Sequence, residues 1–332
     1  MNTLFVLLDG MEDHPHPLLG GKKPYEAANM PFMYRKAKHK FFTSGKGYTQ
    51  LFLNEFFTGR PPELPRAVLE AMGLGLDISN GRTAYRLSPA EIKDGMIRWS
   101  YHAHLFCDEL MSTIMRNFHI LREHDPQIEF FLNGRAVITM VCDDVPDLPA
   151  PPVDAPFKEV PGDLGKLVMK VAEEMNGITD YPWGCGRYTV QYKPYECLGK
   201  MTAISDSPTA LGVAASLGHD ILLINQVEDR FPAAKEALER GNVFLHIDEV
   251  DEYSHQKDPY KKIEILERTD RLMEKYFSDA ERVVYFVDHG TSCVTGEHII
   301  MNVPFWTNIE TDMSDGELIP LDTVIPRLMR QR

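Results

Sequence analysis

This sequence of 332 residues lacks a long apolar run, an excess of basic residues and a regular cysteine pattern. Each of these absences excludes a class of function. No uncharged apolar run approaches the ~20 residues that a membrane span needs, and Asp9 interrupts the N-terminus before a signal-peptide core is complete. Basic residues are too few for nucleic-acid binding, since the net charge of −14 repels a polyanion. The composition therefore predicts a cytoplasmic protein with neither a membrane nor a nucleic acid as its partner.

Cysteine is also scarce. The five cysteines are odd in number and have no C-x-x-C spacing, so neither a disulfide framework nor a thiolate zinc site is indicated. Hydrophobic residues make up 43% of the chain and charged residues 25%, which is ordinary for a globular protein and excludes general disorder. The length is that of about two domains.

Three short apolar runs predict the central strands of an α/β sheet. Residues 4–8, 243–247 and 283–287 are rich in β-prone residues and nearly apolar on both faces, as buried parallel strands are. Helical patterns cover residues 208–217 and 259–276. This alternation predicts a mostly parallel sheet with helices on both faces, built from residues 1–98 and 203–332.

The middle of the chain differs in composition. Residues 99–202 mix aromatic residues, histidine and proline, and the proline-rich segment 145–156 can form neither a helix nor a central strand. We expect residues 99–202 to form an inserted, smaller α/β domain that closes over the substrate as a cap.

Potential metal ligands follow each of the three apolar runs. Because the carboxyl ends of parallel strands lie on one edge of a sheet, these side chains are expected to converge. Three aspartates and three histidines suit two ions of zinc or manganese, with magnesium as a further option, better than one calcium. Two such ions form a clamp for phosphoryl transfer and supply the positive charge that an acidic protein needs to receive a phosphate. The six residues are Asp9, Asp251, His255, Asp288, His289 and His298.

Several motifs, taken together, match a known family. They are DGMED (9–13), LGGKKPYEAANMP (19–31), EAMGLG (70–75), WGCGR (183–187), DEYSH (251–255) and DHGTSCVTGEH (288–298). This set resembles the archaeal-type cofactor-independent phosphoglycerate mutases of the alkaline phosphatase superfamily, nearly from end to end. The resemblance implies an alkaline-phosphatase-like fold and a metal-dependent phosphotransferase, phosphomutase or hydrolase.

The resemblance also implies a nucleophile and a division of the ligands. The family uses a serine, and counting back from Pro61 places Thr49 at that position, whereas a slip in the alignment would bring Ser44 or Thr43 there. A threonine hydroxyl can be activated by a metal as a serine can, through a phosphothreonine intermediate. One ion would then be held by Asp9, Asp288, His289 and the Thr49 oxygen, and the other by Asp251, His255 and His298.

The expected substrate pocket departs from the family. Where the family carries a cluster of arginines, this chain has His102 and His104, and histidine cannot reproduce the bidentate fork of arginine. Arg135 and Arg187 remain as candidate anion contacts. We expect a small phosphorylated or phosphonate metabolite as substrate. The chemistry is that of a mutase or, alternatively, of a phosphatase, phosphodiesterase or phosphonate-processing enzyme, and a catalytically silent metal-binding homologue is a third alternative.

Overall fold

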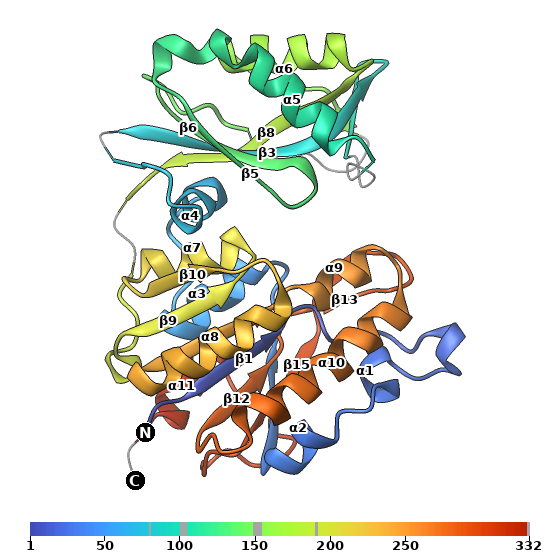
Figure 1. The fold of residues 1–332 in the computed structure, drawn as a ribbon, viewed down its shortest axis with the longest axis vertical. Coiled ribbons are helices and arrows are strands. Elements are labelled where there is room, and N and C mark those ends of the chain that lie inside the picture. Colours follow the sequence, from blue (N-terminus) through green and yellow to red (C-terminus); the bar gives the residue numbers. More distant parts are fainter. Residues whose placement is uncertain (80, 100–104, 149–154, 190–191, 331–332) are drawn as a thin grey trace. The chain divides into compact units, whose positions relative to one another are not determined.

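The chain folds as two compact units, each with its own sheet. The computed structural model describes residues 1–79, 81–99, 105–148, 155–189 and 192–330 (Figure 1). Unit 1 comprises Met1–Pro62 and Gln191–Arg332, and unit 2 comprises Glu63–Val190. No helix in the described part of the chain is long and apolar enough to cross a membrane.

Unit 1 is built on a seven-stranded sheet. Its strands, with a separate β13–β14 pair, are β1 (Leu4–Leu8), β2 (His39–Ser44), β9 (Met201–Ser205), β10 (Asp220–Leu223), β11 (Asn242–Ile247), β12 (Val283–Phe286), β13 (Gly290–Thr291), β14 (His298–Ile299) and β15 (Asn302–Thr307). The order in the sheet is β10-β9-β11-β1-β12-β15-β2. The first five strands are mutually parallel, and β15 is antiparallel to both of its neighbours. The three predicted central strands are therefore β11, β1 and β12, side by side.

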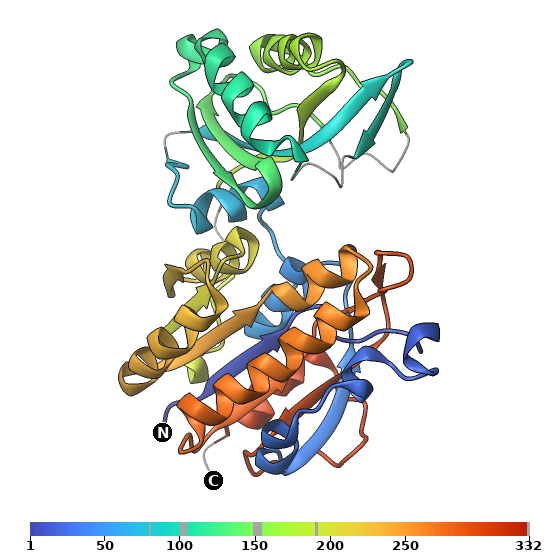
Figure 2. The ribbon, with the colours of Figure 1, turned by 45° about the vertical axis from the view of Figure 1, so that its right-hand side comes forward.

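Helices cover both faces of this sheet (Figure 2). They are η1 (Pro17–Leu19), α1 (Pro24–Ala27), α2 (Pro31–Lys36), α3 (Thr49–Thr58), η5 (Glu196–Leu198), α7 (Pro208–Ser216), α8 (Val227–Arg240), α9 (Glu249–His255), α10 (Pro259–Phe277) and α11 (Leu321–Leu328). α3, α7 and α11 pack together on one face, and α10 packs with α2 and α8 on the other. The predicted helices 208–217 and 259–276 are α7 and α10. The predicted fold class, a mostly parallel α/β sheet covered on both faces, is confirmed.

Aromatic packing fixes α3 against the sheet. Phe52 and Phe56 lie one turn apart on this helix and are fully buried. Their rings lie 6.1 and 4.8 Å from that of Phe286 on β12, centroid to centroid. Such aromatic contacts combine a large buried area with a defined geometry. The apolar face of α3 therefore positions the first residue of the helix, Thr49.

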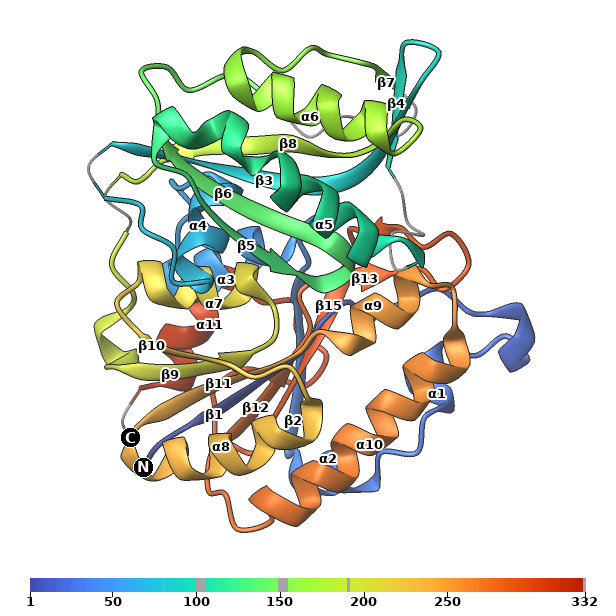
Figure 3. The ribbon, with the colours of Figure 1, turned by 45° about the horizontal axis from the view of Figure 1, so that its top comes forward.

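Unit 2 is an antiparallel sheet with its own helices (Figure 3). The sheet order is β5-β6-β3-β4-β7, and β8 pairs with β3. α5 and α6 pack together, and α4 packs against β3 and β8. The elements are α4 (Arg66–Gly73), β3 (Arg82–Lys93), β4 (Met96–Trp99), α5 (Cys107–Asn117), η3 (Phe118–His124), β5 (Gln127–Phe131), η4 (Leu132–Gly134), β6 (Arg135–Val141), β7 (Ala155–Pro156), α6 (Gly162–Glu174) and β8 (Ile178–Arg187).

Unit 2 does not coincide with the insert predicted over residues 99–202. It begins at residue 63 and ends at residue 190, because β3 pairs with β4, β6 and β8 and so belongs to this sheet. Composition did not mark this boundary, since residues 63–98 have an ordinary mixture of apolar and polar residues. The function of this unit as a cap over the substrate stays a prediction.

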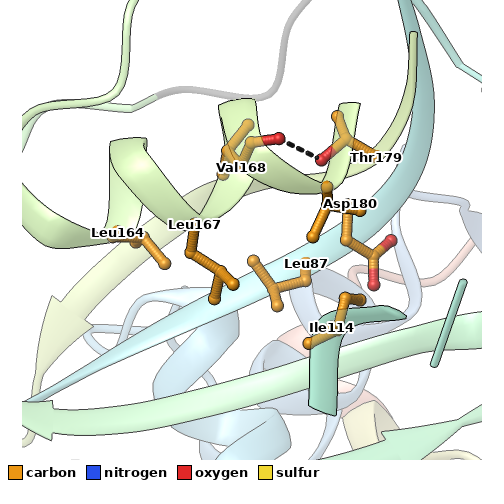
Figure 4. A pocket seen from close by; sticks show the side chains of 8 residues that line it. Leu87, Ile114, Leu164, Leu167, Val168, Thr179 and Asp180 are labelled. Atoms are coloured by element: carbon orange, nitrogen blue, oxygen red, sulfur yellow. Dashed lines mark hydrogen bonds between the residues drawn. The ribbon is translucent and has the colours of Figure 1, made fainter. Parts of the chain in front are cut away.

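One carboxyl group of unit 2 is buried in apolar surroundings (Figure 4). Asp180 on β8 lines a small cavity together with Leu87 and Leu164, and neither of its carboxyl oxygens has a hydrogen-bond partner in the described structure. Burial raises the pKa of Asp180 well above its ordinary value. The nearby guanidinium groups of Arg86 and Arg135 oppose this shift but do not outweigh burial.

A buried histidine links the stability of unit 1 to pH. His219 lies between α7 and β10, is 7% exposed, and accepts a hydrogen bond from the Met201 amide at 3.3 Å. Burial lowers the pKa of His219 to about 4. Between its unfolded pKa of about 6.5 and this folded value, acid protonates the unfolded chain but not the folded one, so stability falls with falling pH.

We predict that His219→Gln weakens this pH dependence. The free energy of unfolding should fall less between pH 7 and pH 5 in the variant than in the parent, by about 2 kcal/mol. Urea unfolding at both pH values measures the difference. His14→Gln, at an exposed position, is the matched control and should leave the pH dependence unchanged. An equal slope in His219→Gln and the parent would contradict the prediction.

Candidate metal centre

The six predicted ligands converge in unit 1, beside the carboxyl ends of β1, β11 and β12. Each of the six residues either lies in a helix or strand or follows a strand, and that element sets its position. Asp9 directly follows β1, Asp251 and His255 lie one turn apart on α9, Asp288 and His289 follow β12, and His298 begins β14.

A first group of donor atoms surrounds His289. Its Nε2 lies 3.3 Å from Asp9 Oδ1, 3.3 Å from Asp288 Oδ2 and 3.4 Å from Thr49 Oγ. The two carboxylate oxygens are buried and have no hydrogen-bond partner in the described structure. Ligands about 2.0–2.2 Å from a tetrahedral ion stand about 3.3–3.6 Å apart. His289 Nε2 therefore lies at about the ligand-to-ligand spacing of a divalent ion from each of the three oxygens, and two of these oxygens have unused lone pairs.

A second group joins α9 to β14. Asp251 Oδ2 lies 3.0 Å from His255 Nε2 and 3.6 Å from His298 Nε2, and the two imidazole nitrogens are 3.2 Å apart. The opposite ring nitrogens are already engaged, because His255 Nδ1 bonds the Gly296 carbonyl at 2.7 Å and His298 Nδ1 bonds the Gly47 carbonyl at 2.8 Å. Backbone acceptors thus direct both Nε2 atoms toward the same point. This group fits a second divalent ion.

Neighbouring residues connect the two groups. The Gly10 amide donates to Asp288 Oδ1 at 3.2 Å. The Thr291 hydroxyl donates to Asp251 Oδ1 and lies 3.2 Å from His289 Nδ1. Thr291 therefore orients one candidate ligand from each group, which makes the two groups parts of one centre.

The electrostatics of the centre favour bound cations. Burial, and then repulsion by Asp288 and Asp251, raises the pKa of Asp9 well above its ordinary value. Burial acts in the same direction on Asp251, but the adjacent His255 outweighs it and lowers the pKa of that carboxyl. In return Asp251 overcomes burial at His255 and raises its pKa to about 9. Carboxylates so close together need positive charge beside them.

A buried lysine supplies one such charge. Lys262 on α10 is fully buried, and its Nζ donates to the carbonyls of Gly10 at 2.9 Å and Thr291 at 3.0 Å. Its Nζ also lies 3.6 Å from Asp13 Oδ2. Lys262 therefore ties the segment after β1 to the segment after β12.

Comparison with known proteins agrees with this geometry. Residues 216–317 match the Metalloenzyme superfamily. The chain is 25% identical to the 2,3-bisphosphoglycerate-independent phosphoglycerate mutase of Pyrococcus abyssi, over 89% of this chain and 85% of that enzyme. It is 22% identical to the enzyme of the same name from Picrophilus torridus, over 96% of this chain and 91% of the relative.

This chain is similar to the archaeal cofactor-independent phosphoglycerate mutases over most of its length. The resemblance inferred from the motifs is thereby confirmed, and residues 216–317 are similar to a metalloenzyme superfamily. Solved structures agree on the fold. A protein from Pyrococcus horikoshii aligns with a TM-score of 0.71 at 19% identity, over 99% of this chain and 96% of that one. The cofactor-independent phosphoglycerate mutase from Thermoplasma acidophilum aligns with a TM-score of 0.55 at 17% identity, over 98% of each chain.

The candidate nucleophiles occupy different surroundings in this mutase-like fold. Thr49 is the first residue of α3 and is partly exposed, and its hydroxyl donates to Asp9 Oδ2 at 3.3 Å. Thr43 is fully buried, and its hydroxyl has no hydrogen-bond partner in the described structure. Ser44 is exposed at the end of β2. Of the three hydroxyls, that of Thr49 lies within the first group.

The predicted anion contacts belong to unit 2 or lie outside the described residues. Arg135 begins β6. Arg187 ends β8, where its guanidinium donates to the Thr83 hydroxyl at 3.1 Å and to the Asp143 carbonyl at 2.8 Å. His102 and His104 are outside the described residues.

Sequence reasoning missed two buried polar residues that contact the centre. Lys262 follows Lys261 in a polar stretch and resembles any surface lysine. His246 lies inside the predicted strand 243–247 and is fully buried, with its Nε2 2.7 Å from Asp9 Oδ2. Burial lowers the pKa of His246 to about 3, so its ring is neutral. An imidazole within an otherwise apolar strand was a usable signal, because a buried ring nitrogen needs a partner.

We predict that Gly10→Ala disrupts the centre. Gly10 has a φ of +58°, and a Cβ there would stand 2.4 Å from Asp251 Oδ1 and 2.5 Å from Thr291 Oγ. The clash adds to the backbone strain, and such overpacking costs about 1–3 kcal/mol. Urea unfolding measures the lost stability, and elemental analysis measures the lost metal.

Gly20→Ala is the matched control for this substitution. Its φ of +65° imposes similar backbone strain, but a Cβ there meets nothing within 4 Å. The control should therefore keep its full metal content. If both variants lose stability and metal equally, backbone strain alone is responsible and the packing argument fails.

Proposed function

We propose that this chain catalyses metal-dependent phosphoryl transfer on a small phosphorylated metabolite, through a phosphothreonine formed at Thr49. The position of the Thr49 hydroxyl carries this proposal. It lies 3.4 Å from His289 Nε2 and 3.3 Å from Asp9 Oδ2, beside the two orphaned carboxylate oxygens of the first group. This is the spacing of a nucleophile that is also a metal ligand.

Two divalent ions, manganese or zinc with magnesium as a further option, complete the site in this proposal. Asp9, Asp288, His289 and Thr49 would hold one of them, and Asp251, His255 and His298 the other. When bound, the ions lower the pKa of the hydroxyl and neutralise the phosphoryl oxygens.

The residues of the chain then perform two successive transfers. Thr49 Oγ forms a bond to phosphorus as the bond between phosphorus and the leaving oxygen breaks, and its proton passes toward Asp9 Oδ2, the acceptor 3.3 Å away. In the second transfer a hydroxyl oxygen forms a bond to phosphorus as the bond between phosphorus and Thr49 Oγ breaks. The proton of the attacking hydroxyl balances the one that the first leaving oxygen takes up, and Thr49 Oγ recovers its own proton from Asp9 Oδ2. A hydroxyl of the same metabolite completes a mutase reaction, another alcohol completes a phosphotransfer, and water completes a hydrolysis.

The residues proposed to bind the rest of the substrate are those that the sequence indicated. Arg135 and Arg187 are the proposed anion contacts, with His102 and His104 where the family has arginines. Loss of an arginine fork removes charge-assisted hydrogen bonds that contribute about 1.5–3 kcal/mol each. We therefore expect weaker use of 3-phosphoglycerate than by a mutase that keeps the arginines.

That loss favours a phosphatase, phosphodiesterase or phosphonate-processing activity as the second candidate. Steady-state assays on 3-phosphoglycerate, 4-nitrophenyl phosphate and a phosphodiester separate the two. Efficient conversion of 3-phosphoglycerate to its 2-isomer, without release of phosphate, would support the mutase. Faster release of phosphate from 4-nitrophenyl phosphate, or cleavage of the phosphodiester, would support the hydrolase.

The ligand division predicts two separable metal sites. Metal-free protein reconstituted with manganese or zinc should contain about two equivalents by elemental analysis, because two complete donor groups are present. Asp288→Ala should lose one equivalent and His255→Ala the other. Glu252→Ala, on the same helix as His255 but in neither group, should keep both. Unchanged metal content in the first two variants would refute the assignment.

Thr49 is predicted to be essential, whichever acceptor completes the reaction. Thr49→Val keeps the shape but lacks the hydroxyl, and should lower kcat about 1,000-fold or more, whereas Thr49→Ser should keep turnover. Acid quenching during turnover of a radiolabelled phosphomonoester should trap label on Thr49. Ser44→Ala is the control and should behave as the parent. Full activity in Thr49→Val would remove the proposed nucleophile.

A further inference from the structure

A line of hydrogen bonds crosses three neighbouring strands and ends on Asp9. Ser205, the last residue of β9, lies 2.7 Å from His246 Nδ1 on β11, measured from its Oγ. His246 Nε2 lies 2.7 Å from Asp9 Oδ2, after β1. The Ser207 amide donates to Ser205 Oγ at 2.8 Å. Ser205, His246 and Asp9 are all buried, with exposed fractions of at most 1%.

The partners at the two ends determine where the protons lie. Because Ser205 Oγ accepts the Ser207 amide, its own hydrogen is available to His246 Nδ1. With a cation at Oδ1, Asp9 is ionised and can only accept, so His246 Nε2 would then carry the ring proton in the bond to Oδ2. All the donors then point in one direction, from the Ser207 amide to Asp9.

This arrangement controls which oxygen of Asp9 faces the first group. Oδ2 is occupied by His246 and by the Thr49 hydroxyl. Oδ1 has no hydrogen-bond partner in the described structure and lies 3.3 Å from His289 Nε2. Holding Oδ2 therefore fixes the rotation of the carboxylate and leaves Oδ1 for a cation.

The spacing argues against His246 as a metal ligand itself. Donor atoms of Asp9, His246 and Asp248 lie within 4.8 Å of one another, as ligands of one ion would. The 2.7 Å between His246 Nε2 and Asp9 Oδ2 is, however, a hydrogen-bond length, and it departs further from the separation of about 3.3–3.6 Å between two ligands of a tetrahedral ion than any of the 3.0–3.6 Å spacings given for the two groups. The first group has that wider separation, and His246 does not.

We propose that His246 is a positioning residue: held by Ser205 in its Nε2-protonated form, it orients Asp9 for the ion on the nucleophile side. The inference extends the proposed function, because it concerns the metal site that contains Thr49. Groups that orient a metal ligand in this way typically contribute about 10- to 100-fold to metal affinity. The measurements that test the role of His246 do not require turnover. The positioning role can therefore be wrong while the phosphoryl-transfer proposal is right, and the phosphoryl-transfer proposal can be wrong while the positioning role is right.

Nitrogen-15 NMR of the histidine side chains in zinc-loaded protein tests the proton positions. His246 should show a protonated Nε2 and a bare Nδ1, with no change of the ring nitrogens beyond a small shift when zinc binds. The Nε2 signals of His289, His255 and His298 should move strongly. A proton on Nδ1 of His246, or a zinc-dependent change as large as that of His289, would overturn the proposal.

Zinc titration calorimetry of metal-free variants tests the positioning effect. Ser205→Ala and His246→Ala should weaken one of the two sites about 10- to 100-fold and leave the other unchanged. His246→Gln, whose amide can donate to Asp9, should recover part of that affinity. Ser216→Ala removes a hydroxyl that bonds only its own helix in the described structure and should bind zinc as the parent does.

Circular dichroism checks that each variant is folded before titration. Equal weakening of both sites in folded Ser205→Ala would show a general structural effect and overturn the proposal. Unchanged affinity in Ser205→Ala and His246→Ala would also overturn it. If His246→Ala does not fold, Ser205→Ala and His246→Gln, which keep the shape of the site, still decide the outcome.

Discussion

Repulsion among buried carboxylates is the constraint on which this site depends. Asp9, Asp251 and Asp288 stand together at the carboxyl edge of a sheet whose central strands are fully buried. Charge interactions strengthen as the surroundings become less polar, so three negative groups cannot remain together there without compensation. Divalent cations bound at these oxygens would relieve this repulsion. The candidate ligands therefore lie where burial creates the strongest need for positive charge.

Fixed side chains offset the negative charge around the ligands without using the ligand oxygens. Lys262 bonds two backbone carbonyls beneath the centre rather than a candidate ligand. The fully buried Arg230 on α8 bonds Asp206 at 2.7 Å and both carboxylate oxygens of Glu249. The neutral ring of His246 adds a donor without adding charge. These bonds leave Asp9 Oδ1 and Asp288 Oδ2 without a hydrogen-bond partner in the described structure.

The strand-end pattern was sufficient to predict the sheet and the gathering of the six candidate ligands. Buried parallel strands can be recognised as apolar runs in the sequence. Because the residues that follow such strands lie at one edge of the sheet, Asp9 and Asp288 could be predicted to lie close together although they are far apart in the sequence. Lys262 could not be found in this way, because its burial depends on where α10 packs and not on its neighbours in sequence. The start of unit 2 was missed because β3 belongs to the second sheet through its pairing with β6 and β8, which lie far along the chain. For Arg187 the sequence motif indicated an anion contact, and the structure reveals bonds to backbone carbonyls of its own unit.

The hydrogen bond between His298 and Gly47 links the second group to the segment that carries Thr49. His298 Nδ1 bonds the Gly47 carbonyl at 2.8 Å, and Gly47 lies two residues before Thr49 on the segment that enters α3. A shift of this imidazole is transmitted through a short, directional contact to the backbone that carries the hydroxyl. The position of the His298 ring therefore bears on the position of the Thr49 hydroxyl. The two groups of donor atoms are thus joined through the backbone of this segment as well as through Thr291.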